Sequence, residues 1–144
     1  MSEARVEAGG RALGAIGRGV LALVGVERGD GEAEAARLVE RVLGYRMFPD
    51  EAGKMNRSLL DIQGGLLAVS QFTLVADTGT GTRPGFSRGA APEEGRRLFE
   101  LFLQKAKTKI PHAQSGIYGA DMKVSLVNDG PVTFWLQAAP RPRS

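Results

Sequence analysis

The sequence predicts a single α/β domain in which two helices pack on one side of a sheet. A chain of 144 residues has the length of one compact domain and can bury a core without disulfides or metals. Apolar runs that are typical of strands alternate with two longer segments of helical periodicity, in the order strands, helix, strands, helix, strands. This order is typical of helices layered on a sheet.

The strands are predicted from apolar runs that end at glycines or polar turns. We expect the strands at residues 11–17 and 20–26 to form a hairpin, with Arg18-Gly19 as the turn. The strand at residues 66–72 follows the Gly64-Gly65 turn and is predicted to lie in the interior of a sheet. A strand that starts at Met47-Phe48 is also expected, before a turn over residues 49–53. Besides the strand at Met47-Phe48, the predicted strands are residues 11–17, 20–26, 66–72, 124–127 and 132–136.

Two segments, residues 30–45 and 92–109, have apolar residues at helical spacing. In the first, Asp30 is a suitable N-cap, and the inward stripe is Ala35, Leu38, Val39, Val42 and Leu43. In the second, Pro92 suits the first turn, and the stripe is Leu98, Phe99, Phe102, Leu103 and Ala106. Residues 138–144 are predicted to form a disordered tail.

Composition narrows the functional classes. The chain has no cysteine, so disulfides and thiolate chemistry are excluded, and a reducing cytoplasm is the expected location. No run approaches the ~20 apolar residues of a membrane span. The net charge of +3 is compatible with a nucleic-acid partner.

Few side chains are available for acid–base catalysis. His112 is the sole histidine, so a Ser-His-Asp triad with any other histidine and a metal site of several histidines are both excluded. If the protein is an enzyme, catalysis should depend on oriented hydroxyls, backbone N–H groups and a hydroxyl of the substrate. We therefore expect neither a metal nor a cofactor.

A polar segment at the end of an apolar run is the best candidate for such a site. In the predicted strand, Ser70 and Phe72 face one way, while Gln71 and Thr73 face the other. The structural alternative is that these hydroxyls satisfy the backbone of a loop. A loop follows over residues 76–88, and a loop of that length in a small domain is often functional.

Two blocks of sequence resemble the signature motifs of the D-aminoacyl-tRNA deacylases. The first consists of residues 69–74, 76–78 and 83–87, and contains Ser-Gln-Phe-Thr. The second consists of residues 119–122 and 128–133, and contains Asn-Asp-Gly-Pro-Val-Thr. Residues 24–30 and 50–56 resemble further stretches of the family, so the resemblance covers residues 2–137 in the right order.

The resemblance implies a homodimer that hydrolyses the ester between a D-amino acid and the terminal adenosine of tRNA. It also implies the family fold, a barrel-like sandwich of β-sheets with two main helices packed on one side, over residues 1–137. Ser70 and Gln71 would hold the terminal ribose and the carbonyl, and Phe72 would offer its backbone N–H to the oxyanion. Thr73 would have a positioning role, because the chain offers no base to activate its hydroxyl.

The second block is expected to bind the amino acid. By resemblance, Gly130-Pro131 is a Gly-cisPro element that crosses the dimer interface into the partner's pocket. Its carbonyls would accept the α-ammonium and leave no room for the side chain of an L-amino acid, whereas glycine would be tolerated. The residues expected to complete the pocket and the adenine site are Phe86, Ala90, Tyr118 and Met122, for each of which an ordinary core position is the alternative.

This chain departs from the family pattern at its start. The family begins with a strand that carries a Gln-Arg-Val-like segment, and Met1-Ser2-Glu3 falls where that strand has just ended. We therefore expect the first strand to be absent, together with an arginine that would brace the Gly-Pro element. A rival interpretation follows, namely a non-catalytic tRNA-binding or scaffold dimer.

Overall fold

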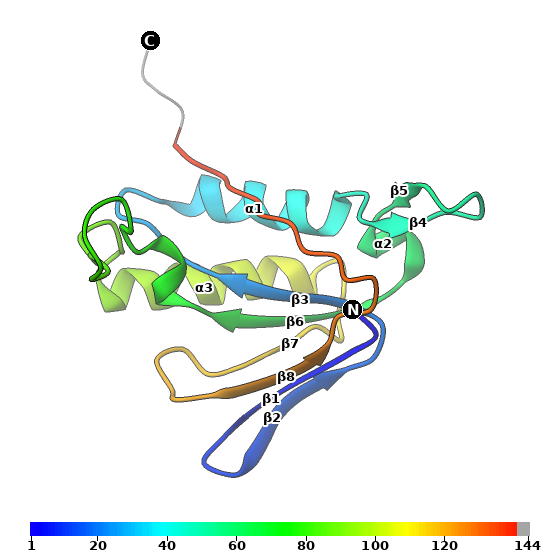
Figure 1. Cartoon of the computed structure of the whole chain (residues 1–144), viewed down its shortest axis with the longest axis horizontal. Coiled ribbons are helices and arrows are strands. Elements are labelled where there is room, and N and C mark those ends of the chain that lie inside the picture. Colours follow the sequence, from blue (N-terminus) through cyan, green and yellow to red (C-terminus); the bar gives the residue numbers. More distant parts are fainter. Residues whose placement is uncertain (141–144) are drawn as a thin grey trace.

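The computed structural model describes residues 1–140, which form three stacked layers (Figure 1). The strands are β1 Glu3–Ala8, β2 Arg11–Ile16, β3 Gly19–Val24, β4 Phe48–Pro49, β5 Met55–Arg57, β6 Gly65–Ser70, β7 Gln114–Ser115 and β8 Lys123–Val127. The helices are α1 Glu32–Gly44, α2 Leu59–Ile62, the 3₁₀ turn η1 Phe72–Val75 and α3 Pro92–Lys107.

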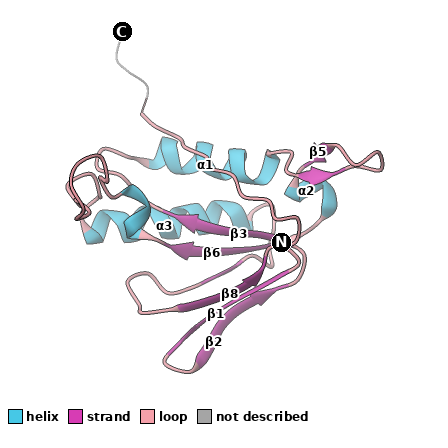
Figure 2. Cartoon of the chain, in the orientation of Figure 1, coloured by secondary structure: helices cyan, strands magenta, loops and turns pink. Residues whose placement is uncertain are grey.

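The middle layer is the parallel sheet β3-β6-β7, with α1 and α3 on one face and the antiparallel sheet β2-β1-β8 on the other (Figures 1 and 2). Strand β6 explains this arrangement. Its residues Leu66 and Ala68 belong to the core under the helices, while Leu67 and Val69 belong to the core between the sheets. Since alternate residues of a strand face opposite sides, a strand that is apolar throughout is buried on both faces.

The α/β class and the two main helices are confirmed. The two sheets form a sandwich, and in the described part of the chain they do not close into a barrel. Both helices bury the stripes expected of them, with Leu38 and Leu103 only partly buried. Helix α1 is capped at Gly31, whose N–H donates to Glu34 Oε2, instead of at Asp30. Along the described residues, no helix combines the length and apolarity needed to cross a membrane.

The predicted first hairpin is wrong. Strand β2 pairs with β1, while β3 pairs in parallel with β6, so the turn after β2 carries the chain from one sheet to the other. Strand β1 was not expected, because its alternation of Ala4 and Val6 with charged residues is short and lies in a polar segment. Apolar runs indicate where strands are, but they do not indicate which strands pair.

The predicted last strand, residues 132–136, is also wrong. This segment runs along α1 without pairing (Figure 1). Arg41 Nη1 donates to the Gln137 carbonyl at 2.7 Å, and Arg37 donates to the Ala139 carbonyl. A segment of high β propensity needs a strand edge beside it, and here an apolar groove of about 690 Å³ separates it from β3. Of the tail predicted to be disordered, residues 141–144 lie outside the described residues.

Candidate functional site

The Ser-Gln-Phe-Thr segment lies where β6 ends, beside the end of β3. The N–H of Gln71 donates to the Val24 carbonyl at 2.8 Å, which extends the pairing by one residue. The Gln71 carbonyl then accepts the N–H of Leu74 at 3.2 Å, and the chain turns into η1. A Cβ at Gly25 would lie 2.9 Å from Val75 Cγ1, so this close approach of β3 and η1 requires glycine.

The expected strand alternation through Thr73 is wrong, because the strand stops at Ser70. In the turn that follows, Gln71 Nε2 donates a hydrogen bond to Thr73 Oγ1. Phe72 occupies the first position of η1, and the first N–H groups of a helical turn have no acceptor within that turn. The segment thus combines backbone N–H groups that have no acceptor within the turn with a hydroxyl that is hydrogen bonded to an amide.

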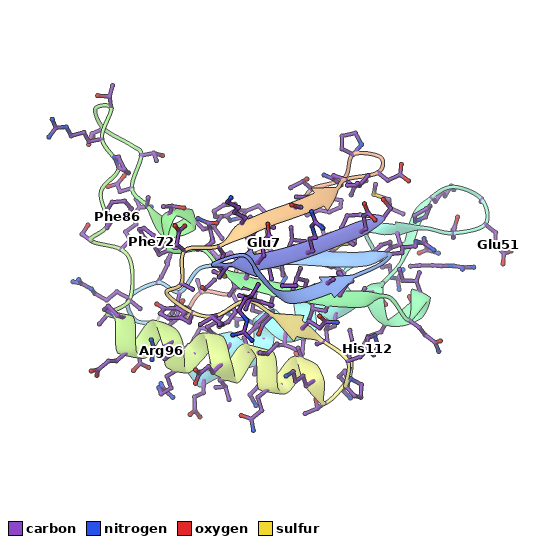
Figure 3. All side chains as sticks on the ribbon, turned by 90° about the horizontal axis from the view of Figure 1, so that it is seen from below. Glu7, Glu51, Phe72, Phe86, Arg96 and His112 are labelled. Carbon is purple, nitrogen blue, oxygen red and sulfur yellow. The ribbon has the colours of Figure 1, made fainter. Side chains whose placement is uncertain are left out.

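Two aromatic rings lie together beside this segment. Phe72 is 68% exposed and Phe86 is 48% exposed, and their centroids are 5.4 Å apart with the ring planes at 50° (Figure 3). Each of these two exposed rings offers a flat apolar face suited to stacking against a planar ring. The structure therefore brings Phe86 to the Ser-Gln-Phe-Thr segment, as the sequence indicated.

The loop that carries Phe86 is tied down at three places. Asp77 and Gly85 exchange backbone hydrogen bonds of 2.7 and 2.9 Å. The N–H of Arg28 donates to the Arg88 carbonyl at 2.7 Å. The N–H of Ala90 donates to the Val26 carbonyl at 3.0 Å, which places half-buried Ala90 beside the segment that follows β3.

The other two predicted pocket residues, Tyr118 and Met122, are partly buried and pack against the two cores. Tyr118 packs against α3, with its ring centroid 6.1 Å from that of Phe99. A Cβ at Gly95 would lie 2.3 Å from the Tyr118 hydroxyl, which explains a glycine in the first turns of α3. Met122 packs in the core between the sheets, where its sulfur covers Gly116. For these two residues the structure shows the packing role that the sequence left open.

The second motif lies directly after β8. The Gly130–Pro131 peptide is cis, as the resemblance implies. The side chain of Asn128 holds the loop, because its Oδ1 accepts the N–H of Val132 at 3.2 Å and its Nδ2 donates to Thr133 Oγ1 at 3.1 Å. Gly130 has φ +141°, a conformation that L side chains rarely adopt, and both Gly130 and Pro131 are exposed.

This loop lies at the start of β3, beside the N-terminus. The Met1 ammonium donates to the Gly19 carbonyl at 3.2 Å, and the N–H of Ser2 donates to the Val127 carbonyl at 3.0 Å. Burial, and then Arg18, lower the pKa of the Met1 ammonium, whereas the Asp129 carboxylate raises it. This end of β3 therefore carries both charge signs.

The two motifs consequently lie at opposite ends of β3 (Figure 1). Six residues of strand span roughly 20 Å at about 3.3 Å per residue. The apolar groove runs between the two ends, from Met1 and Gly19 to Gly25 and Leu74. Within the described chain, the Gly-Pro loop and the Ser-Gln-Phe-Thr segment do not line one pocket.

Titratable side chains do not gather at Thr73. Within residues 1–140, no hydrogen bond joins its hydroxyl to a carboxylate or an imidazole. His112 follows α3, far from Phe72 and Phe86 (Figure 3). The Asp30 carboxylate accepts the N–H of Glu27 at 2.8 Å, and burial raises the pKa of Asp30. The chemistry available at Thr73 is therefore hydrogen bonding and not proton abstraction.

Comparison with known proteins identifies the family. The family described as D-Tyr-tRNA(Tyr) deacylase matches residues 1–137. This chain belongs to that family. A D-aminoacyl-tRNA deacylase of Alkalilimnicola ehrlichii is 57% identical over 96% of this chain and 92% of its own length. One of Vibrio cholerae is 59% identical over 96% of this chain and 95% of its own.

Two solved structures share the fold. A c-Myc DNA unwinding element binding protein superposes with a TM-score of 0.90 at 34% identity, over 96% of this chain and 95% of its own. A structure described as a probable eukaryotic D-amino acid tRNA deacylase superposes with a TM-score of 0.71 at 16% identity, over 87% of this chain and 88% of its own. At that lower identity the second likeness shows the fold alone.

Proposed function

We propose that this protein hydrolyses the ester between a D-amino acid and the terminal adenosine of tRNA, releasing the free amino acid and tRNA. The observation that carries the proposal is the family match over residues 1–137, in a chain whose Ser-Gln-Phe-Thr segment is an exposed turn of backbone donors and hydroxyls. Curated relatives at 57% and 59% identity carry this activity in their names. A cytoplasmic location is part of the proposal.

The catalytic roles in this proposal are those that the family resemblance implies. Ser70 and Gln71 hold the terminal ribose and the ester carbonyl, and the N–H of Phe72 binds the oxyanion of the tetrahedral intermediate. Water attacks the ester carbon, the bond to the ribose oxygen breaks, and that oxygen takes up a proton. Since no side-chain base lies at Thr73, the neighbouring hydroxyl of the ribose assists the water.

The exposed aromatic pair binds the adenine of the terminal nucleotide. Stacking of a base on an aromatic side chain contributes roughly 1–3 kcal/mol to binding. Phe72 and Phe86 offer such a surface directly beside the catalytic turn. In this proposal Ala90, Tyr118 and Met122 complete the walls of the pocket, and the last two do so from core positions.

The amino acid is selected by a second copy of the chain. Because the Gly130-Pro131 loop lies about one strand length from Thr73 in its own protomer, a complete site needs the loop of a partner. A two-fold axis near the middle of β3 would bring each loop to the catalytic turn of the other copy. Four exposed large side chains line the groove that such a dimer would cover: Leu23, Leu126, Phe134 and Trp135.

Selectivity then comes from main-chain atoms. The carbonyls of the Gly130-Pro131 loop accept the α-ammonium of the substrate, and the loop occupies the space that an L side chain would need. Glycine has no side chain to exclude, so Gly-tRNA is expected to be hydrolysed as a side activity.

The test is hydrolysis of D-Tyr-tRNA and L-Tyr-tRNA by the purified protein. We expect release of D-tyrosine at a rate at least ~100-fold above that of L-tyrosine, the discrimination that a few kcal/mol of steric exclusion supplies. Equal hydrolysis of the two esters, or hydrolysis of neither, would contradict the proposal.

A second candidate is nucleic-acid binding without hydrolysis. One observation favours it, since the structural neighbour at 34% identity is named for binding DNA. This alternative expects the protein to retain uncharged tRNA or DNA in a filter-binding assay while D-Tyr-tRNA stays intact. The same preparation therefore separates the two functions.

A further inference from the structure

Two arginines, Arg28 and Arg88, lie on neighbouring stretches of backbone close to the exposed aromatic pair. Both are exposed, and Arg88 follows Phe86 by two residues. We propose that these two side chains bind the phosphate that joins the terminal adenosine of tRNA to the preceding nucleotide. The inference rests on the proposed function for the position of that adenosine, and it deepens the proposal by naming a contact with the backbone of the substrate.

The main chain places the two arginines opposite each other. The N–H of Arg28 donates to the Arg88 carbonyl at 2.7 Å, and an antiparallel bridge joins Glu27 to Gly89. Arg28 and Arg88 are therefore the next opposite pair along these two stretches. Side chains directly opposite in an antiparallel pair project to the same face, with Cβ atoms about 4.5–5.5 Å apart. Two guanidinium groups thus start from adjacent, fixed points of one surface.

Two positive charges in this arrangement cost stability, because like charges directly opposite in an antiparallel pair repel each other. Within residues 1–140, Arg28 forms no ion pair that would offset this cost. The carboxylate beside Arg88 offsets little of it. Asp77 Oδ1 lies 3.9 Å from Arg88 Nη2, beyond hydrogen-bond distance, and already accepts the N–H of Gly79 at 2.9 Å. The two arginines therefore keep their charge and most of their donors for an anion from outside the chain.

A phosphodiester attached to a stacked adenosine fits this pair. In the proposed function the adenine stacks on Phe72 and Phe86, whose centroids are 5.4 Å apart, and a single ribose separates that base from its 5′-phosphate. The planar guanidinium binds phosphate through two parallel N–H···O bonds. Two guanidinium groups can accordingly hold both free oxygens of one phosphodiester, and the phosphate removes the repulsion between Arg28 and Arg88.

The test compares three D-tyrosyl esters that differ only beyond the adenosine. They are D-Tyr-tRNA, 3′-O-D-tyrosyl-AMP, and 3′-O-D-tyrosyl-adenosine, which has no phosphate. Arg88→Gln removes the charge, and we expect KM for the first two esters to rise about 10-fold with kcat unchanged, as for the loss of one hydrogen bond to a charged group. The loss should vanish with the adenosine ester. Arg88→Lys keeps the charge without the planar fork and should recover part of the affinity.

Arg57→Gln is the matched control. Arg57 is also a partly exposed arginine beside a carboxylate, since its Nη2 lies 3.3 Å from Glu51 Oε1. Glu51 lies at the opposite end of the molecule from Phe72 and Phe86 (Figure 3). This variant should leave KM unchanged for all three esters.

Binding of uncharged tRNA gives a second measurement that does not depend on hydrolysis. A double variant with Arg28→Gln and Arg88→Gln should lower the slope of log affinity against log salt concentration by about 1, because one phosphate contact and its released counterion are lost. Arg57→Gln should keep the wild-type slope.

Three outcomes would decide against parts of this account. A KM that rises equally for all three esters would show that Arg88 shapes the loop around the adenine and does not touch the phosphate. Unchanged KM values and salt slope in the double variant would show that the two side chains are ordinary surface charges. In both cases the wild type is active on D-Tyr-tRNA, so the proposed function survives. A wild type that hydrolyses none of the esters would remove the proposed function, while the salt slope would still decide the phosphate contact.

Discussion

The two motifs of this chain are both polar loops that follow a strand, yet they are held in different ways. The Ser-Gln-Phe-Thr turn follows β6, which is buried on both faces, and the N–H of its Gln71 donates to the Val24 carbonyl. The Gly130-Pro131 loop follows β8, which has one face open to solvent, and is held by the side chain of its own Asn128. The first geometry is fixed by the sheet of this chain, whereas the second is a local loop that, in the proposed function, contacts a second copy of the chain.

This difference fits the two roles in the proposed reaction, catalysis by the turn after β6 and selection of the amino acid by the loop after β8. The catalytic turn must place hydrogen-bond donors within a few tenths of an ångström, and a buried strand gives it that rigidity. The selecting loop must approach another subunit, and an exposed loop can do so without disturbing a core. Stability should therefore respond mainly to changes near the first motif, and substrate selection to changes at the second.

The largest effect on stability is expected at β6. Leu67 is fully buried between the sheets, and Leu67→Ala should cost about 3 kcal/mol of unfolding free energy. For a domain of this size, Tm should fall by roughly 10 °C, as measured by circular dichroism. Leu60→Ala, at a position on α2 that is 40% exposed, is the control and should change Tm far less.

Gly130→Ala should give the largest effect on function with little effect on stability. Alanine cannot readily hold φ +141°, and its Cβ would lie 2.9 Å from Val132 Cγ2. The loop must rearrange and lose its contact with the substrate, so we expect D-Tyr-tRNA hydrolysis to fall about 100-fold, the rate effect of roughly 3 kcal/mol of lost interaction.

Gly53→Ala is the matched control for that variant. Gly53 also has a positive φ, of +80°, in the turn between β4 and β5, with open space around its Cβ position. It should show the backbone strain without the loss of activity. A Gly130→Ala variant that keeps both rate and preference would mean that this loop does not touch the substrate.

Asn128→Ala should have an intermediate effect. It removes both side-chain hydrogen bonds of the loop, each of which contributes about 1 kcal/mol. We expect about a 10-fold loss in kcat/KM for D-Tyr-tRNA. Thr133→Val removes only the bond to Asn128 Nδ2 and should lose less. If the two variants are equally impaired, the bond from Val132 to Asn128 is not what holds the loop.

The smallest effect is expected at Asp30, near the end of β3 that lies beside the Ser-Gln-Phe-Thr turn. Its raised pKa means that ionisation costs stability in the folded state. The contribution of the protonated form is present below the unfolded pKa and is lost as the pH rises through the folded pKa. Asp30→Asn keeps an acceptor for the Glu27 N–H, so it should equal or slightly exceed the wild type at pH 7 in urea unfolding.

Solvent screening at this half-buried group should limit that gain to a few tenths of a kcal/mol, and the gain should vanish as the pH falls below about 4. An asparagine variant that is clearly less stable at pH 7 would show that the charge of Asp30 is needed.

Much of the fold could be read from the sequence, for physical reasons that particular residues make clear. Helices α1 and α3 were found because their apolar stripes repeat at helical spacing. Strand β6 was found because it is apolar throughout. The pairing of β2 with β1 was not predicted, nor was the unpaired course of residues 132–136. Both depend on which strand edge lies beside a segment, and no local sequence pattern encodes that.

The site was predicted in part. The motifs located Phe72 and Phe86, which the structure brings together. Strand alternation failed beyond Ser70, because β6 ends there and the chain turns into η1. The hydrogen bond from Gln71 to Thr73 could not be predicted, since it exists only in that turn.

The most direct test of a site shared between two subunits is a mixing experiment. One variant carries Ser70→Ala with Thr73→Val, the other carries Gly130→Ala, and each is expected to be nearly inactive alone. After the two are unfolded and refolded together at equal amounts, half of the dimers should be mixed, and each mixed dimer has one site with both halves intact. We expect about a quarter of the wild-type activity on D-Tyr-tRNA to return. If activity stays at the level of the separate variants while mixed dimers are present, the two motifs do not meet across an interface and the account is wrong.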